Sequence, residues 1–312
     1  MNSDKLNDKT RRNFIKTILI GTGATIIGGS ILSLGNNASP RLSSQERLSS
    51  SNQVKIEIPD DPKNHWGFVI DLAKCDGCES QSEIDYSNIF DESKNDEKSV
   101  LDIIKDEKPR CVFACRSSHN FLKANPPQYW INVYKLQDNP HTPPYFFPKP
   151  CQNCQDPPCE HVCPTGATFI RKDGTVLINH KTCIGCRICM AGCPYETRFF
   201  WYNEPNKEEN AKSSAEDYRP EHLLYHTRGT VTKCDYCLHQ VVKGALPHCV
   251  QACPQGALYF GNLNEDAVTN GEEILELNKI LEAKGAYRFK EDEGTRPSVF
   301  YLPPSYRKNN IW

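Results

Sequence analysis

Apolar residues in this chain fall in short runs that end just before cysteines or begin just after them. The runs Phe68–Asp71 and Val176–Asn179, rich in β-branched residues, each end four residues before a cysteine. Such runs are typical of β-strands, so each predicts a strand that leads into a loop. The segments C-P-T-G-A-T-F-I (163–170) and C-P-Q-G-A-L-Y-F (253–260) mirror each other and predict a turn followed by a short strand. The chain therefore repeats a small unit of strand, loop, turn and strand.

The C-terminal part of the chain changes to helical spacing. Apolar residues at positions 274, 275, 277, 280 and 281 predict a helix within the segment 271–285, with Gly285 as its stop signal. We expect this helix to pack on the outside of the protein or on a partner. A second, short helix is predicted to begin at Ser99.

The N-terminal segment combines a basic start with an uncharged stretch. T-R-R-N-F-I-K (10–16) precedes residues 17–40, which are rich in Gly and Thr. Paired arginines, an aromatic residue and a weakly apolar segment are typical of a twin-arginine export signal, here residues 1–40. A retained membrane anchor is the alternative, because no clear A-x-A site accompanies a cleavage near Ala38. No other stretch is long enough to span a membrane.

Composition excludes several classes of function. The chain has 312 residues with a formal net charge of −2, which gives no reason to expect a nucleic-acid partner. Its 22 Pro and 18 Gly indicate a loop-rich protein. No nucleophile–base pattern, G-x-G-x-x-G motif or P-loop is present, so we expect no bond-making chemistry on this chain.

Sixteen cysteines form the main chemical feature. They fall into four groups of four, each framed by C-x2-C and C-x3-C, with middle spacers of thirty-two, four, two and eleven residues. Pro follows the last cysteine in every group except the first, where Arg116 stands instead. The groups are Cys75-Cys78-Cys111-Cys115, Cys151-Cys154-Cys159-Cys163, Cys183-Cys186-Cys189-Cys193 and Cys234-Cys237-Cys249-Cys253.

Disulfides and zinc are the alternatives to an iron–sulfur interpretation. Cysteine makes up about 5% of the chain, below the level typical of disulfide scaffolds. Zinc sites use C-x2-C pairs, but not the run C-x2-C-x2-C-x3-C-P of the third group. That run is the bacterial ferredoxin pattern, in which three cysteines hold one [4Fe–4S] cluster and the fourth binds the neighbouring cluster. Four groups therefore predict four [4Fe–4S] clusters.

The exchange of fourth ligands constrains how the groups pair. The second and third groups are adjacent and form one unit, which leaves the first and fourth groups to form the other by elimination. The predicted ligand sets are cluster A with Cys75, Cys78, Cys111 and Cys253; cluster B with Cys234, Cys237, Cys249 and Cys115; cluster C with Cys151, Cys154, Cys159 and Cys193; and cluster D with Cys183, Cys186, Cys189 and Cys163.

The predicted fold class is α+β, with tandem nested bacterial-ferredoxin-like units organised around the clusters. The first unit comprises residues 65–145 and 229–264, with an acidic insertion at 79–110, and the second, inserted unit comprises 146–202. A Ser-rich linker (41–64), a second linker (203–228) and a C-terminal helix and tail (265–312) complete the chain.

The chain resembles the four-cluster iron–sulfur subunit of complex iron–sulfur molybdoenzymes, such as dimethyl sulfoxide, polysulfide and tetrathionate reductases. The likeness covers roughly residues 65–303. It is highest in the segments W-G-F-V-I-D-L-A-K-C (66–75), C-Q-N-C-Q-D-P-P-C-E-H-V-C-P-T-G-A (151–167), C-I-G-C-R-I-C-M-A-G-C-P-Y (183–195), K-C-D-Y-C (233–237), C-V-Q-A-C-P-Q-G-A (249–257) and G-T-R-P-S-V-F-Y-L (294–302).

The resemblance implies a non-catalytic electron-transfer subunit. Its partners would be a molybdopterin-containing catalytic subunit and a quinone-reactive integral membrane subunit, and its place would be peripheral, on the periplasmic or extracytoplasmic face. Clusters are inserted in the cytoplasm, so an export signal for folded proteins fits this role. Alternatives are an electron carrier of a nitrite reductase or hydrogenase pathway, or a structural protein held by zinc or disulfides. The terminal substrate and the direction of electron flow stay open.

The first group departs from the family pattern. The family commonly has two residues between the second and third cysteines, whereas residues 79–110 here carry ten Asp or Glu against five Lys or Arg. A solvated loop and a docking element for a partner subunit are the two interpretations. The insertion leaves open an altered potential or cluster type at cluster A.

Several other side chains flank the cysteines. His161 and His248 stand beside ligand positions, where we expect a surface or supporting role. Lys233 and Arg187 either raise a cluster potential or solvate the surface. The aromatic residues at 130, 195, 201 and 236 are expected to pack around clusters rather than relay electrons.

Overall fold

The computed structural model describes residues 61–80, 109–205 and 226–304. The predicted export signal, the helix expected from Ser99 and most of the acidic insertion lie outside the described residues. Strands and short helices alternate with long loops, in a mixed, ferredoxin-like architecture.

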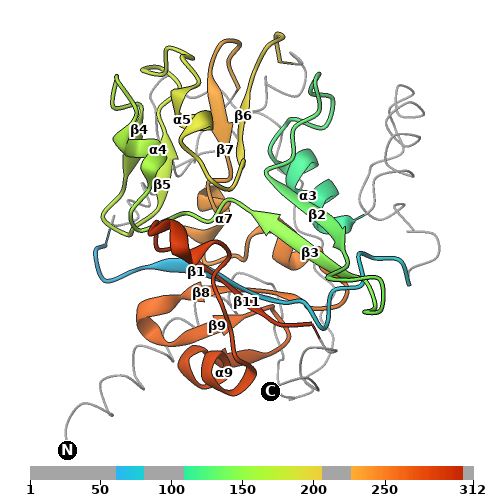
Figure 1. Cartoon of the computed structure of the whole chain (residues 1–312). Helices are drawn as coiled ribbons and strands as arrows, with labels where there is room; N and C mark the ends of the chain where they lie inside the picture. The colour runs from blue at the N-terminus through green and yellow to red at the C-terminus, as the bar shows by residue number, and fades with distance from the viewer. Residues whose placement is uncertain (1–60, 81–108, 206–225, 305–312) are drawn as a thin grey trace, which may run out of the picture.

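A five-stranded sheet with the order β10-β9-β8-β1-β11 forms one end of the molecule (Figure 1). β1 (Trp66–Asp71) pairs antiparallel with β8 (Leu258–Asn262) and parallel with β11 (Val299–Leu302). β9 (Ala267–Thr269) and β10 (Ile274–Glu276) extend the sheet beyond β8. This order places the chain that precedes the first cysteine group beside the chain that follows the fourth.

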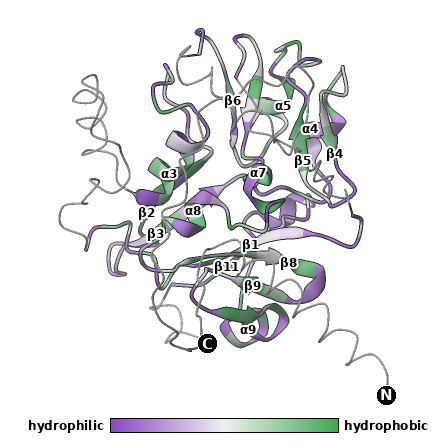
Figure 2. Cartoon of the chain, turned by 180° about the vertical axis from the view of Figure 1, so that it is seen from behind, coloured by the Kyte–Doolittle hydropathy of each residue, from purple (hydrophilic) through white to green (hydrophobic). Residues whose placement is uncertain are grey.

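The two faces of this sheet bury different partners, because successive side chains of a strand point to opposite sides. Val69, Tyr259 and Leu302 pack on one face with Leu277 of α9 (Leu277–Lys284), which carries both hydrophobic and hydrophilic residues (Figure 2). Residues from the other face, including Phe68, join the largest core cluster, to which cysteines also belong. The sheet therefore separates the layer of α9 from the cysteine loops.

Three antiparallel hairpin-like pairs build the rest of the molecule above the sheet in Figure 1. β6 and β7 are far apart in sequence, so their pairing ties the chain after the third cysteine group to the chain just before the fourth. The pairs are β2 (Ile131–Leu136) with β3 (Tyr145–Pro150), β4 (Thr168–Ile170) with β5 (Val176–Ile178), and β6 (Arg198–Phe200) with β7 (Val231–Lys233).

Short helices carry many of the cysteines. α4 begins with Pro158 at its first position, where the missing N–H of proline costs no hydrogen bond. α3 packs against α8, and α4 packs against α5. The helices are α3 (Arg110–Ser118), α4 (Pro158–His161), α5 (Ile188–Ala191), α7 (Leu238–Val241) and α8 (His248–Gln251), with 3-10 turns η1 (Leu263–Glu265) and η2 (Glu291–Glu293).

The strands predicted from the apolar runs at 68–71 and 176–179 are confirmed as part of β1 and as β5, which ends one residue early at Ile178, and 168–170 and 258–260 also form strands. The predicted C-terminal helix is shorter than its apolar spacing suggests. Residues 274–276 are β10, paired with β9, and the helix begins only at Leu277 and ends at Gly285 in a left-handed conformation. The region expected to be a helix and tail also supplies β9 and β11 to the sheet.

Candidate metal centres

All sixteen cysteines lie within the described residues, and all are free thiols. Ten of them are buried, and among the sixteen only Cys186 is exposed. No disulfide joins any pair, so the disulfide interpretation finds no support in the structure. The positions of these thiols relative to one another decide what they can bind.

One cavity has Cys75, Cys78 and Cys111 of the first group on its walls together with Cys253 of the fourth. Prolines such as Pro109, aliphatic residues and the polar residues Asp76 and Gln255 complete the lining. Three thiols from one group and one from another thus face a single space, despite the long insertion that separates Cys78 from Cys111.

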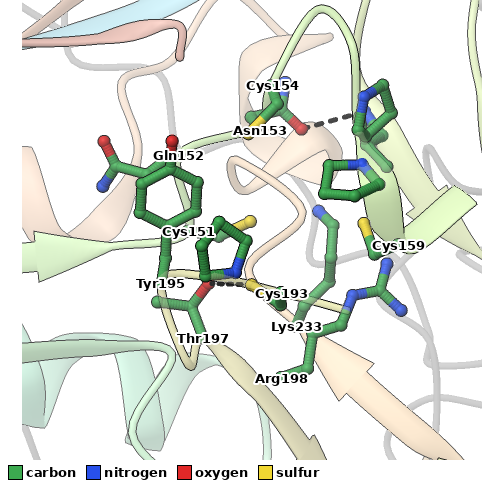
Figure 3. A pocket seen from close by; sticks show the side chains of 14 residues that line it. Cys151, Gln152, Asn153, Cys154, Cys159, Cys193, Tyr195, Thr197, Arg198 and Lys233 are labelled. Atoms are coloured by element: carbon green, nitrogen blue, oxygen red, sulfur yellow. Dashed lines mark hydrogen bonds between the residues drawn. The ribbon is translucent and has the colours of Figure 1, made fainter. Parts of the chain in front are cut away.

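A second cavity repeats this arrangement in the inserted part of the chain (Figure 3). Its thiols are Cys151, Cys154 and Cys159 of the second group and Cys193 of the third. In Figure 3, Lys233 and Arg198 lie on the side of Cys159. Again the fourth thiol comes from a neighbouring group.

Most of the remaining thiols lie near one another in two further sets, as the effects of neighbouring thiols on each pKa indicate. Burial raises the pKa of Cys115 well above its usual range, and the nearby thiols of Cys234 and Cys249 add to this effect. Burial likewise raises the pKa of Cys189, and Cys183 and Cys163 contribute in the same direction. The fourth thiol of the first group therefore lies with the fourth group, and that of the second group lies with the third.

The four C-x2-C loops share one backbone feature. The residue before the second cysteine is left-handed in each loop, with φ of 63° at Gly77, 43° at Asn153, 70° at Gly185 and 60° at Tyr236. Gly and Asn adopt this conformation readily, whereas a bulky residue does so at a cost. Tyr236 is held by burial and by an edge contact with Phe68 at 4.9 Å between ring centroids. All four loops thus share this left-handed residue, including the one in the stretched first group, and in the first and fourth loops the second cysteine is left-handed as well.

Backbone amides at or just after the Ala of the mirrored C-P-x-G-A segments donate to the sulfur of the preceding cysteine. The N–H of Ala257 lies 3.3 Å from Sγ of Cys253, and the N–H of Thr168 lies 3.5 Å from Sγ of Cys163. Amide donors favour the negatively charged form of the sulfur they contact. These bonds suit a thiolate that binds metal.

Several of the buried thiols are not poised as free nucleophiles. Burial raises the pKa of Cys75, Cys154 and Cys249 to about 12 each. Four such groups around one space ionise together only when a cation compensates their charge, and thiolate is the form that binds metal. The donor set therefore fits a metal cofactor with four cysteine ligands at each position.

Two buried, positively charged side chains support the interpretation that the thiols bind metal as thiolates. Arg198 is 3% exposed and Lys233 is 4% exposed, and both line the second cavity. The Nε and Nη2 of Arg198 are buried without an oxygen acceptor, and Lys233 donates through Nζ to the Cys234 carbonyl at 2.5 Å. Buried charges need opposite charges, and thiolates that hold an anionic metal cofactor would supply them here.

A cluster of polar side chains, most of them buried, lies beside the fourth cysteine group. Potential metal-binding atoms of His119, Asp235 and His239 lie within 4.8 Å of one another. Nε2 of His119 is 3.4 Å from Oδ1 of Asp235 and 3.5 Å from Sγ of Cys237, and Oδ1 also accepts the Cys237 N–H at 2.8 Å. The contacting atoms are therefore engaged as hydrogen-bond donors and acceptors around Cys237.

Sequence reasoning missed two of these supporting residues, Arg198 and His119. Each is a single residue outside any motif, and only the fold brings it to a thiol. Of the flanking residues considered from sequence, Lys233 is buried, while His161 and Arg187 are exposed. The four aromatic residues at 130, 195, 201 and 236 are buried. Within the described part of the chain, no helix has the length and apolar character needed to cross a membrane.

Comparison with known proteins agrees with the chemistry of the thiols. Residues 143–219 and 207–263 match the model of the 4Fe–4S dicluster domain. The chain is 32% identical over 309 residues to the Hdr-like menaquinol oxidoreductase iron–sulfur subunit 1 of Archaeoglobus fulgidus, with 94% of this chain and 97% of the relative covered.

Two further relatives belong to reductases. The putative iron–sulfur subunit of the dimethyl sulfoxide reductase of Halobacterium salinarum is 29% identical, with 80% of this chain and 82% of the relative covered. A subunit of the selenate reductase of Mesobacillus selenatarsenatis is 28% identical, with 97% of this chain and all of the relative (100%) covered. The likeness thus extends over nearly the whole of two of these three relatives.

Proposed function

The chain belongs to the family of iron–sulfur subunits of complex iron–sulfur molybdoenzymes, and from this membership we propose that it conducts electrons through four [4Fe–4S] clusters. In this proposal the ligand sets A to D are those defined by the exchange of fourth cysteines, and the unit formed by the second and third groups is nested inside the other. The observation that carries the proposal is the composition of the two cavities. Each joins three thiols of one group to the fourth thiol of another.

The residues of the chain would bind the clusters and tune their reduction potentials. When bound, the clusters supply reversible one-electron chemistry. The cysteine loops hold them by the shared left-handed turn, amides such as that of Ala257 donate to the ligand sulfurs, and buried aromatic residues such as Tyr236 exclude water. These features favour electron transfer between neighbouring sites over chemistry on a substrate.

The proposed partners are a molybdopterin-containing catalytic subunit at one end of the cluster chain and a quinone-reactive membrane subunit at the other. Support comes from relatives named as subunits of a menaquinol oxidoreductase and of two reductases. The test is to purify the native complex under anaerobic conditions and identify its subunits. We expect a molybdopterin protein to co-purify and a quinol to reduce the clusters. A complex that contains a haem nitrite reductase or a hydrogenase instead would contradict the choice of partner.

The export of the folded protein is a further part of the proposal. It is supported by T-R-R-N-F-I-K at residues 10–16 followed by an uncharged segment. Replacement of both Arg11 and Arg12 by Lys should keep the protein in the cytoplasm, as measured by cell fractionation. Normal export of that variant would contradict twin-arginine transport.

A further inference from the structure

Arg198 is a permanently charged side chain that lacks a carboxylate partner among the described residues. It lies at the start of β6, is 3% exposed, and donates through Nη1 to Oγ1 of Thr168 at 3.1 Å. Its Nε and Nη2 are also buried, but neither has an oxygen acceptor. Among the described residues, no carboxylate forms an ion pair with it. Because a guanidinium does not lose its proton in proteins, this charge cannot be relieved by titration.

The nearest negative groups of Arg198 are thiols of two different sets. Although burial opposes a charged guanidinium, Cys159, Cys189 and Cys151 together raise the pKa of Arg198. Among these thiols, Cys189 lies close enough for the positive charge of Arg198 to act on its pKa as well. Cys159 and Cys151 belong to set C, and Cys189 belongs to set D. One buried positive charge thus stands between two proposed clusters.

The unit formed by the first and fourth cysteine groups has different charged residues near its thiols. The negative charge of Asp76 contributes to the raised pKa of Cys75 and of Cys78. Asp235 contributes in the same way to the raised pKa of Cys115 and of Cys237. Arg110 is a cation near Cys78, and Lys233 is one near Cys234 that also acts on Cys159 of set C. Among the described residues, Arg198 is therefore distinctive because its positive charge acts on thiols of both ligand sets, C and D, of a single unit.

We propose that Arg198 is a positioning residue that holds one positive charge between clusters C and D and raises the midpoint potentials of both. The inference rests on the proposed function, because it requires clusters at both positions. When one cluster gains an electron, its neighbour loses one, and Arg198 exchanges neither an electron nor a proton. Its fixed charge stabilises the more negative, reduced form at either position, and because Arg198 itself is buried, solvent and salt screen this charge less than they screen a surface charge.

The test uses the full chain, purified anaerobically, in redox titrations followed by EPR. Arg198→Gln keeps a side-chain amide donor for Thr168 and removes the charge. We expect two of the four one-electron transitions to move to lower potential and the other two to stay. The matched control is Arg228→Gln, which removes an exposed charge outside the cysteine groups that pairs with Glu204 at 3.8 Å. Solvent and salt screen that charge, so the control should show no resolved shift.

The possible outcomes distinguish the role of Arg198 from the proposed function of the chain. No shift, a shift of one transition only, or an equal shift in the control would overturn the role of Arg198 while leaving the clusters in place. A wild-type protein without iron and sulfide would instead overturn the proposed function. If Arg198→Gln fails to assemble clusters, Arg198→Lys decides, because it retains the charge. Recovery of four transitions near wild-type potentials supports the proposal, and continued loss of clusters C and D contradicts it.

Discussion

Nε2 of His119 lies 3.5 Å from Sγ of Cys237, although 118 residues separate the two in sequence. Burial lowers the pKa of His119 well below its usual range, and His239 and His248 act in the same direction, so the imidazole is neutral. Because Nε2 faces both Cys237 and the Asp235 carboxylate, which are acceptors, it is the nitrogen that carries the proton. The chain that follows the first cysteine group thus donates a hydrogen bond to a thiol of the fourth.

Loss of this donor should lower the potential of cluster B. His119→Phe keeps an aromatic ring against Trp130 but removes the N–H···S hydrogen bond. A differential effect of about 1.4 kcal/mol on the two oxidation states corresponds to about 59 mV for a one-electron couple, which sets the expected scale. EPR-monitored redox titration measures the shift, and the exposed His141→Phe is the control. An unchanged set of four potentials would show that the contact has no tuning role.

The exchange of fourth ligands predicts a remote effect of Cys253→Ser. Cys253 belongs to the fourth group but lines the cavity of Cys75, Cys78 and Cys111. We therefore expect the EPR signal of cluster A to change or to be lost, with cluster B retained. A change confined to the cluster held by Cys234, Cys237 and Cys249 would contradict the pairing.

Gly185 should not tolerate a side chain. Its φ is +70°, and a Cβ at this position would lie 2.0 Å from the carbonyl oxygen of Gly229. The backbone conformation alone costs Ala about 1 kcal/mol, and the steric clash adds to this cost. Gly185→Ala should therefore reduce the iron content by about the share of one cluster.

The matched control for this substitution is Gly166→Ala. Its φ is +62°, but its Cβ would have no neighbour within 4 Å. This variant should lose a little stability and retain its iron. Equal iron contents in both variants would show that the close approach of Gly185 to Gly229 is not required for cluster binding.

His226 makes stability depend on pH. Burial lowers its pKa to about 3, although its Nε2–H donates to the His119 carbonyl at 2.6 Å. Between about pH 6.5 and pH 3 the unfolded chain binds a proton that the folded chain does not, so this group reduces stability as the pH falls. The loss at pH 5 is about 2 kcal/mol.

His226→Gln should weaken this pH dependence, because glutamine keeps an N–H donor and does not titrate. Melting temperatures at pH 7 and pH 5, measured anaerobically, should fall less in this variant than in the wild type. The exposed His141→Gln should behave as the wild type does. A fall in His226→Gln equal to that of the wild type would show that another group causes the acid sensitivity.

Local patterns predict the short elements well because β-branched runs and stop signals act over a few residues. Phe68–Asp71 and Val176–Ile178 are strands, and Gly285 ends α9, as expected. Ile274 and Leu275 have the spacing of a helix, but pairing with β9 places them in a strand. Tertiary pairing outweighs local spacing there.

The surroundings of the thiols are harder to predict. Nothing in the local sequence marks Arg198 or His119, since each acts on cysteines from other segments. The left-handed turn can be anticipated at Gly185 but not at Tyr236, whose strain is offset by packing on Phe68. Cysteine spacing therefore reveals the candidate ligands, whereas the residues that tune them depend on the assembled fold.

The content of iron and acid-labile sulfide in the anaerobically purified full chain tests the central claim most directly. The account predicts about sixteen iron and sixteen sulfide per chain, with four one-electron transitions. Zinc with no sulfide, or iron and sulfide sufficient for only two clusters, would contradict a subunit that conducts electrons through four [4Fe–4S] clusters.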